Sequence, residues 1–402
     1  MTVDETVLVL DGHTNQALAC VRSLGRAGYK VLVASDRRWP LSGWSRYCRG
    51  RFRLAGQTIA AFAEMRAWAY RQGAHLVLPA TERACFLCNT ERLQWQALGI
   101  TVGCAPQEML LLAFDKARTL QLAETFGIRI PPTRFPASLA ECRAAAEEVG
   151  FPCVIKPRLS NAWDGIAFLP DRGTSYARDR GELEQAVLAR KQGEAWPLIQ
   201  GFVSGEGKGV FALCDHGRVL TWFAHQRLRD VRPSGSGSSL RRSVALEARL
   251  QIPAERLLAH LHWHGPAMVE FRDNCVGEPC LMEVNGRFWT SLQLAVAAGV
   301  DFPRLWVAIL QGKPVEAQGT YAEGLTLRWL WGDVRRFFHI LAGSPAGYPG
   351  AYPTVWQGMR ELLGAQPPGT CLEVWQRTDP RPAIAECVDG FAEILSRKST
   401  RP

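Results

Sequence analysis

Two short apolar segments that each carry a glutamate constrain this chain more than any other feature of its sequence. Met268–Phe271 and Leu281–Asn285 flank a turn around Val276, and their alternating pattern predicts an antiparallel hairpin in which Glu270 and Glu283 lie opposite one another. Like charges directly opposite in a sheet are destabilising unless a divalent cation lies between them. The hairpin therefore predicts a metal site, and the alternative is two solvated glutamates on an outer face.

The residues that follow the second glutamate supply further polar groups. Asn285 is two residues beyond Glu283 and so shares its face of the strand. Carboxylate and amide oxygens are hard ligands, so we expect Glu270, Glu283 and Asn285 to bind Mg²⁺ or Mn²⁺. Arg287 ends the strand, where its guanidinium can hold a phosphate or carboxylate with two hydrogen bonds. The facing carboxylates also predict that removing one charge will not destabilise the metal-free protein.

Length and composition indicate a protein with several domains and no membrane-spanning segment. The chain has 402 residues, of which 47% are hydrophobic, and this length favours two or three domains. The sequence shows neither a signal-peptide pattern nor an apolar run near the ~20 residues that span a bilayer. Twelve scattered cysteines suit a reducing compartment. Cys85 and Cys88 form a C-x-x-C that fits core thiols better than a redox or metal site. We expect a cytoplasmic protein.

The charge pattern argues against a nucleic-acid partner. The net charge is +9, but the basic residues are interleaved with acids and form no block of like charge. Only seven of the 47 basic residues are lysines. A lysine in this chain therefore needs a particular explanation: Lys116 lies in a predicted helix, and Lys156 ends the predicted strand 151–156.

The first 105 residues predict a small open parallel sheet. Apolar runs alternate with helical patterns there, and the runs cover residues 7–10, 30–34, 75–79 and 99–103. Asp11 and Asp36 follow the first two runs and invite a dinucleotide site. We disfavour an NAD-type site because the turn at Asp11 has one glycine where the dinucleotide fingerprint needs three.

The Gly/Ser-rich stretch 233–239 predicts a loop, which is followed by a helix and then by the glutamate hairpin.

Three histidines near the end of that helix have two competing interpretations. His260, His262 and His264 alternate as in a strand and could form a metal site. They close a helical run, however, so we favour a packing or capping role for them.

The glutamate hairpin and the helix after it resemble the ATP-grasp superfamily, in its carbamoyl-phosphate-synthase-like form. The family has E-x-N followed by Pro or Gly and Arg at this place, and Glu283–Arg287 matches residue by residue; Glu270 and Ser291 also fit. The resemblance covers about residues 1–312. It implies an α/β and α+β fold in which an N-terminal open parallel-sheet domain precedes a two-lobed ATP-grasp module.

On this resemblance we divide the chain into four parts. They are a pre-ATP-grasp domain (1–105), a linker helix with the first lobe (106–195), a second lobe with the metal site (196–312) and a C-terminal extension of unknown role (313–402).

The resemblance also assigns residues to ATP. Lys116 and Lys156 would reach the phosphates, and residues 198–206 resemble the hinge that binds adenine and ribose. By that match the hinge contacts come from Gln200, Gly201, Phe202, Val203 and Glu206. Gln200 stands where the family often has Glu, and its amide oxygen can still accept a hydrogen bond from adenine. The segment 157–165 departs from the family's Gly/Ser-rich phosphate flap, since only Gly165 is flexible by type.

The implied activity is that of a carboxylate-amine ligase. A small carboxylate would attack the γ-phosphate of ATP to give an acyl-phosphate and ADP, and an amine would then displace phosphate, with Lys156 and Arg287 as catalytic residues. Arg241, Arg242 and Ser291 are candidates for substrate binding, although the two arginines also fit a solvated surface loop. The alternative is a non-catalytic nucleotide-binding regulatory or assembly protein. The sequence identifies neither substrate and leaves the oligomeric state open, a homodimer included.

Overall fold

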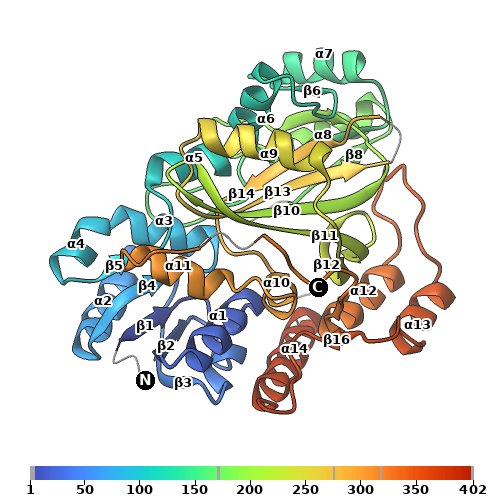
Figure 1. The fold of residues 1–402 in the computed structure, drawn as a ribbon. Coiled ribbons are helices and arrows are strands. Elements are labelled where there is room, and N and C mark those ends of the chain that lie inside the picture. The colour runs from blue at the N-terminus through green and yellow to red at the C-terminus, as the bar shows by residue number, and fades with distance from the viewer. Residues whose placement is uncertain (1–4, 170–172, 275–276, 317–318, 400–402) are drawn as a thin grey trace.

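A computed structural model describes residues 5–169, 173–274, 277–316 and 319–399, arranged around three sheets (Figure 1). Val276 in the expected hairpin turn lies outside the described residues. Within the described part of the chain, no helix is both long enough and apolar enough to cross a membrane.

The N-terminal domain contains the parallel sheet that the sequence predicts. Its strand order is β3-β2-β1-β4-β5, and all pairs are parallel. The strands are β1 (Thr6–Val9), β2 (Lys30–Ser35), β3 (Cys48–Arg53), β4 (Ala74–Leu78) and β5 (Thr101–Val102). The helices are α1 (Asn15–Arg26), the 3-10 helix η1 (Leu41–Trp44), α2 (Ile59–Arg71), α3 (Glu82–Thr90) and α4 (Arg92–Ala97).

Local sequence signals explain where these helices begin. Thr14, Thr58 and Thr81 each occupy the N-cap of a helix and accept a hydrogen bond from a backbone N–H in its first turn. Cys85 and Cys88 on α3 are fully buried in the hydrophobic core, as the core-thiol interpretation predicts.

The first lobe is a four-stranded antiparallel sheet in the order β6-β9-β7-β8. The strands are β6 (Thr133–Arg134), β7 (Cys153–Lys156), β8 (Ser175–Ala177) and β9 (Leu198–Gly201), covered by α7 (Leu139–Val149) and α8 (Arg180–Arg190). Helices α5 (Gln107–Phe114) and α6 (Lys116–Thr125) connect this lobe to the N-terminal domain. Because β9 pairs with β6 and β7, the structure places the end of this lobe after residue 201, beyond the expected boundary at 195.

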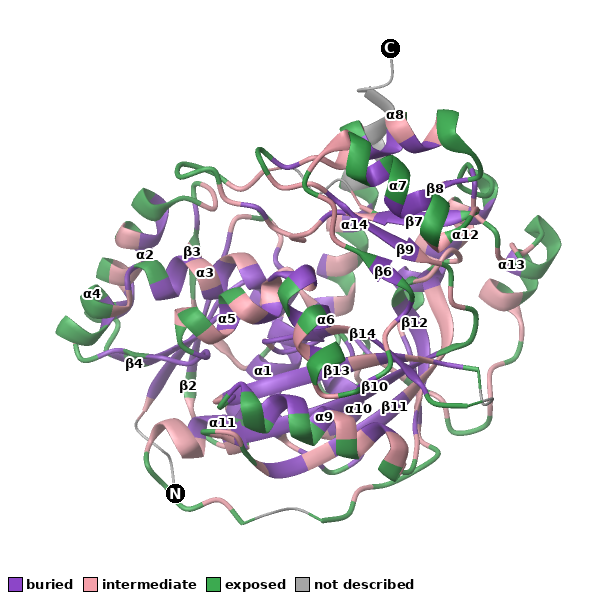
Figure 2. Cartoon of the chain, turned by 90° about the horizontal axis from the view of Figure 1, so that it is seen from above, coloured by how far each residue is buried: buried purple, intermediate pink, exposed green. Residues whose placement is uncertain are grey.

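The second lobe is built on a seven-stranded sheet in the order β14-β13-β10-β11-β12-β15-β16. The strands are β10 (Glu206–Asp215), β11 (Arg218–Arg232), β12 (Ser236–Ser243), β13 (Gly265–Asp273), β14 (Cys280–Asn285), β15 (Thr326–Arg328) and β16 (Cys371–Leu372). The helices are α9 (Ala248–His260), α10 (Leu292–Ala297), α11 (Phe302–Leu310), α12 (Leu330–Leu341), α13 (Val355–Leu363) and α14 (Arg381–Ser399). Strand β10 is buried along most of its length, whereas α7 and α8 expose their outer faces (Figure 2).

The expectation of a loop at 233–239 holds only for residues 233–235, which form the tight turn between β11 and β12. Strand β12 begins at Ser236 and pairs with β11, and its residues 240–242 also pair with β15 on the other side. Neighbouring strands thus fixed a Gly/Ser-rich segment that has little strand preference of its own.

The C-terminal extension is an integral part of the fold. Strands β15 and β16 add to the large sheet, and a buried ion pair of 2.9 Å joins Arg22 on α1 to Asp379. Asn15, also on α1, donates a 3.0 Å hydrogen bond to Glu373. The extension therefore connects the second lobe to the N-terminal domain.

Candidate nucleotide and metal site

The two hairpin glutamates lie opposite one another, as the sequence predicts. Strands β13 and β14 are antiparallel, with Glu270 paired to Glu283. The amide of Asn285 donates a 3.0 Å hydrogen bond to Glu283, and Arg287 donates one of 3.0 Å to the Asn285 amide oxygen. The hairpin thus brings three oxygen-bearing side chains and one guanidinium together at one end of the large sheet.

The two glutamates differ in their electrostatic surroundings. Burial raises the pKa of Glu270, with Glu283 adding to the effect, although Glu270 forms an ion pair with Arg227. Burial also acts to raise the pKa of Glu283, but the lysines Lys116 and Lys156 and the hydrogen bond from Asn285 outweigh it, so this pKa lies below its usual range. Glu283 is therefore the carboxylate whose negative charge the site favours.

Both predicted phosphate lysines face this carboxylate from the first lobe and its linker. Lys156 ends β7, and burial lowers its pKa to about 8, with Lys116 acting in the same direction and Glu283 opposing it. Lys116 begins α6 and donates a 2.6 Å hydrogen bond to Ser160. The cap of α6 is Asp115, which Arg158 holds through a 2.7 Å ion pair. The sequence did not single out Arg158, whose contribution is to fix the start of the lysine helix.

A cavity of about 580 Å³ opens between the two lobes in front of these groups. Eight of the predicted residues line it: Lys116, Lys156, Gln200, Gly201, Phe202, Val203, Glu270 and Glu283. The Gln200 amide donates to Thr133 at 2.8 Å, which leaves its oxygen as the acceptor. Glu206 is not among the lining residues and accepts a 2.6 Å hydrogen bond from Gln226. Residues that the sequence did not suggest also line the cavity: Arg227, Arg232, Arg272, His339 and Tyr352.

The three predicted substrate residues do not line this cavity or the second one described below. Arg241 is fully buried in an ion pair with Glu373 of the C-terminal extension, and Arg242 donates a 3.4 Å hydrogen bond to Thr326 on β15. Ser291 is buried and its hydroxyl lies 3.2 Å from Nδ1 of His225. The expectation for Arg241 fails because its charge is already neutralised inside the protein. Arg242 and Ser291 are likewise placed outside both cavities.

A second cavity, of about 440 Å³, lies between the N-terminal domain and β14. It shares Ser160 and Glu283 with the first cavity. Its lining carries charges of both signs, from Asp11, Asp36, Arg37, Glu82, Arg83, Glu283 and Arg287, and also includes His13. Because Asp11, Asp36 and Glu82 follow β1, β2 and β4, which are neighbours in the parallel sheet, they meet at its carboxyl edge, where open α/β sheets bind ligands.

Hydrogen bonds connect this second cavity to the segment after Lys156. Asn161 donates to Glu82 at 2.8 Å and accepts from Arg83 at 2.6 Å, and Arg287 lies 3.6 Å from Glu82. The N-terminal domain therefore contributes directly to the site, through residues that we considered only for a dinucleotide or not at all.

The C-terminal extension forms one wall of the first cavity. Residues 342–345 line it, and Tyr348 beyond them packs edge-on against Tyr176 of β8 and Phe202 of the hinge, with ring centroids 5.1 and 5.8 Å apart. Tyr176 in turn donates a 3.1 Å hydrogen bond to the Ser234 carbonyl of the β11–β12 turn. The extension thus holds the two lobes together beside the hinge.

This wall predicts an effect of Tyr348 on nucleotide binding. Replacing Tyr348 with Ala removes two aromatic contacts at the hinge, each of which contributes about 0.5–1.5 kcal/mol. We expect nucleotide affinity, measured by calorimetry, to fall by about 2- to 10-fold, which corresponds to the energy of one such contact. Tyr348→Phe, which keeps the ring, is the matched control and should bind as the wild type does. Equal affinity of all three proteins would contradict a binding role for the wall.

Comparison with known proteins agrees with this geometry. Residues 197–332 match the family described as ATP-grasp in the biosynthetic pathway with Ter operon. D-alanine–D-alanine ligase of Stutzerimonas stutzeri is 30% identical over 217 residues, which cover 50% of this chain and 65% of that protein. Formate-dependent phosphoribosylglycinamide formyltransferase of Rhodococcus jostii is 44% identical over 208 residues, which cover 49% of each chain. The chain thus spans about half to two thirds of the length of these curated relatives.

Solved structures show the same fold over most of the chain. Biotin carboxylase of Campylobacter jejuni superposes with a TM-score of 0.65 at 16% identity, covering 80% of this chain and 74% of that one. N5-carboxyaminoimidazole synthetase of Staphylococcus aureus gives a TM-score of 0.62 at 11% identity, covering 81% and 82%.

The chain therefore has the fold of these solved structures: a parallel-sheet domain is followed by two lobes. The first cavity, of about 580 Å³, lies between the two lobes. The metal-strand motif Glu283–Arg287 lies inside the segment, residues 197–332, that is similar to an ATP-grasp family.

Proposed function

We propose that the protein is an ATP-dependent ligase that activates a small carboxylate as an acyl-phosphate and joins it to an amine or similar nucleophile, forming a carbon–nitrogen bond and releasing ADP and phosphate. The observation that carries the proposal is the position of Glu283 and Ser160, which line both cavities. A phosphate transferred at this place can pass from a nucleotide in the first cavity to an acid in the second.

The donor set fits a divalent cation. Glu270, Glu283 and Asn285 offer two carboxylates and one amide oxygen, the hard ligands of Mg²⁺ or Mn²⁺, and Glu283 carries a favoured negative charge. These residues would hold the ion, which when bound neutralises phosphate charge. The chain's own cations add to this effect. Lys116, Lys156 and Arg287 surround the same carboxylate and can stabilise the charge that develops on the transferred group.

The nucleotide is expected to span the first cavity. In this arrangement the backbone of Gly201 and Val203 would contact adenine, and Lys156 and Lys116 the phosphates. Glu206 stands outside the lining, so its contact with ribose would require a movement of the hinge. Closure of the two lobes would exclude water from the acyl-phosphate.

The second cavity suggests what the substrates carry. Its arginines, Arg83 and Arg287, can bind a carboxylate, and its acids, Asp36 and Glu82, can bind an ammonium group. We therefore propose that at least one substrate is a small molecule of amino-acid type. D-alanine–D-alanine ligase, among the sequence relatives, has a substrate of that chemistry. Free thiols throughout the described residues support a reducing, cytoplasmic location as part of this proposal.

The alternative is a nucleotide-binding regulatory or assembly protein without turnover. A protein of that kind does not need a second, charged cavity that adjoins the nucleotide cavity at Glu283 and Ser160. ADP release that depends on an added carboxylic acid would distinguish the ligase from this alternative.

Hydroxylamine provides a direct test of the intermediate. Small carboxylates and amino acids are screened for ADP release, and those that stimulate it are incubated with ATP, Mg²⁺ and hydroxylamine in place of the amine. We expect a hydroxamate of the acid, since hydroxylamine attacks an acyl-phosphate. Stoichiometric AMP and pyrophosphate, or acid-dependent ADP release without any hydroxamate, would overturn the proposed chemistry.

A further inference from the structure

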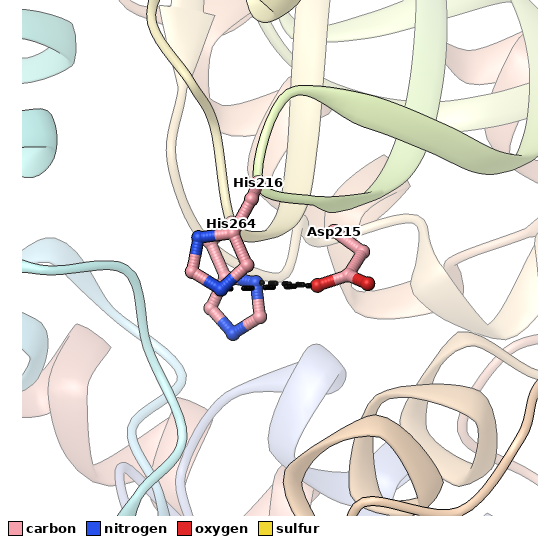
Figure 3. Close-up of side chains that lie close together, drawn as sticks. All are labelled: Asp215, His216 and His264. Atoms are coloured by element: carbon pink, nitrogen blue, oxygen red, sulfur yellow. Dashed lines mark ion pairs between the residues drawn. The ribbon is translucent and has the colours of Figure 1, made fainter.

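Two histidines and an aspartate converge at the end of β10 that is opposite to the hinge (Figure 3). Asp215 ends β10, His216 lies in the turn to β11, and His264 directly precedes β13. One donor atom from each residue lies within 4.8 Å of the other two. We propose that Asp215, His216 and His264 form a second metal site, which binds a transition-metal ion of the Zn²⁺ and Co²⁺ class.

The backbone holds the three residues close together without any ligand. Strands β10 and β13 pair up to Cys214 and Gly265, so the next residues, Asp215 and His264, are cross-strand neighbours. The turn that carries His216 is held against the segment before β13 by a 2.7 Å hydrogen bond from Gly217 N–H to the Trp263 carbonyl.

The turn itself requires an unusual backbone. His216 has φ of 45° and Gly217 has φ of 87°, and a Cβ at Gly217 would meet the Ala259 carbonyl oxygen at 3.0 Å. Histidine at the first of these positions is therefore held in a conformation that Asn or Gly would adopt more easily.

The distances fit a tetrahedral ion. With metal–ligand bonds of about 2.0–2.1 Å, two tetrahedral ligands lie about 3.3 Å apart. Nδ1 of His264 lies 3.3 Å from the Asp215 carboxylate, and Nε2 of His216 lies 3.9 Å from it. The His216 side chain is 73% exposed, so a small rotation can close the longer distance. Three protein ligands would leave a fourth position for water.

One donor atom of the cluster, Nδ1 of His264, has no hydrogen-bond partner among the described residues. Nδ1 of His264 is buried and has no hydrogen bond of acceptable geometry, although Asp215 is near. The two imidazole rings are stacked, 4.2 Å apart at 16°, with the carboxylate beside them (Figure 3). Because a ring nitrogen binds a metal in the plane of its ring, the exposed His216 ring has to turn before both nitrogens point at one ion. Two nitrogen donors and one carboxylate around a shared point form a ligand set that suits zinc and cobalt, whereas Mg²⁺ prefers oxygen ligands.

The site is separate from the cleft. None of its three residues lines either cavity. Glu270 pairs with Gly209 on β10, six residues from Asp215, which corresponds to about 20 Å along the strand. The ion would join the β10–β11 turn to the segment between α9 and β13.

The test is a titration of the untagged full chain with Zn²⁺ by calorimetry and with Co²⁺ by visible absorption, in buffer containing millimolar Mg²⁺. We expect one high-affinity ion per chain, and a Co²⁺ spectrum that shows nitrogen ligands in a low-coordinate site. His216→Asn, His264→Gln and Asp215→Asn should each weaken binding by at least about 10-fold, the smallest loss expected even for an outer-shell change. His216→Asn keeps the left-handed backbone and lies on an exposed turn, so it can be read even if the other variants fold poorly.

The matched control is His262→Asn, which replaces an exposed histidine with a left-handed backbone two residues from His264. It should bind Zn²⁺ as the wild type does. The proposal is overturned if the wild type binds neither ion, if millimolar Mg²⁺ abolishes binding, or if His216→Asn binds as tightly as the control.

Discussion

Glu283→Gln is expected to reduce ligase turnover by about 10²-fold or more at saturating ATP and Mg²⁺. The substitution keeps the shape of the side chain and its contact with Asn285 but removes a negative charge that faces Lys116, Lys156 and the proposed cation. In the proposed mechanism several kcal/mol of transition-state stabilisation would depend on that charge once the closed lobes exclude water. The measurement is the rate of ADP release with the acid and amine substrates identified in the screen.

The matched control for this variant lies in the same hairpin. Glu278 is an exposed glutamate near the turn, so Glu278→Gln makes the same chemical change outside the site and should retain full turnover. Near-normal turnover of Glu283→Gln would show that this glutamate is an ordinary strand residue and would remove the metal site from the proposal.

The structure changes the expected effect of Glu283→Gln on the stability of the metal-free protein. Facing carboxylates alone predict that losing one charge leaves the metal-free protein as stable as before, because repulsion across the strands is relieved. The structure adds cations around Glu283, which keep its pKa below the usual range. A carboxylate with a depressed pKa contributes stability above its unfolded-state pKa, and this stability is lost as the pH falls through the folded-state pKa. Glu283→Gln should therefore lower the melting temperature slightly at neutral pH, and the difference from wild type should shrink in acid.

The hairpin could be predicted from the sequence because its two strands are close together in the chain. Glu270, Glu283 and Asn285 occupy alternating positions of two apolar segments separated by a short turn, so the period of a strand fixes which side chains share a face. The N-terminal parallel sheet was predictable for the same reason, since its central strands are continuous apolar runs buried on both faces.

The rest of the site depends on contacts between distant segments, which no local pattern encodes. Arg241 follows a Gly/Ser-rich stretch that favours a loop, but pairing with β15 and burial against Glu373 place it inside the protein. Asn161 and Glu82 meet from different domains to line the second cavity. Tyr348 reaches the hinge from an extension that carries no recognisable motif.

We expect the affinity for ATP to depend on pH through the ammonium group of Lys156. Burial lowers the pKa of Lys156 to about 8, and a bound phosphate, which is fully ionised in this range, must raise it again. Below pH 8 the ammonium is present before ATP binds. Above pH 8 binding must take up a proton, so the affinity for ATP should fall by up to about tenfold for each further pH unit until the pKa of the bound form is reached.

Two substitutions of Lys156 distinguish the effect of its positive charge from the effect of losing that charge as the pH rises. Lys156→Met lacks the charge, so its affinity for ATP should already be weak at pH 7 and should not fall steeply above pH 8. Lys156→Arg keeps a charge that does not titrate in this range and should bind ATP with little pH dependence. Lys30→Met, which replaces an exposed lysine of the N-terminal sheet, should keep the wild-type profile. Calorimetric titrations with ATP between pH 7 and 10 measure all four proteins. If Lys156→Met retains the wild-type slope above pH 8, another group titrates there and Lys156 does not contact the phosphates.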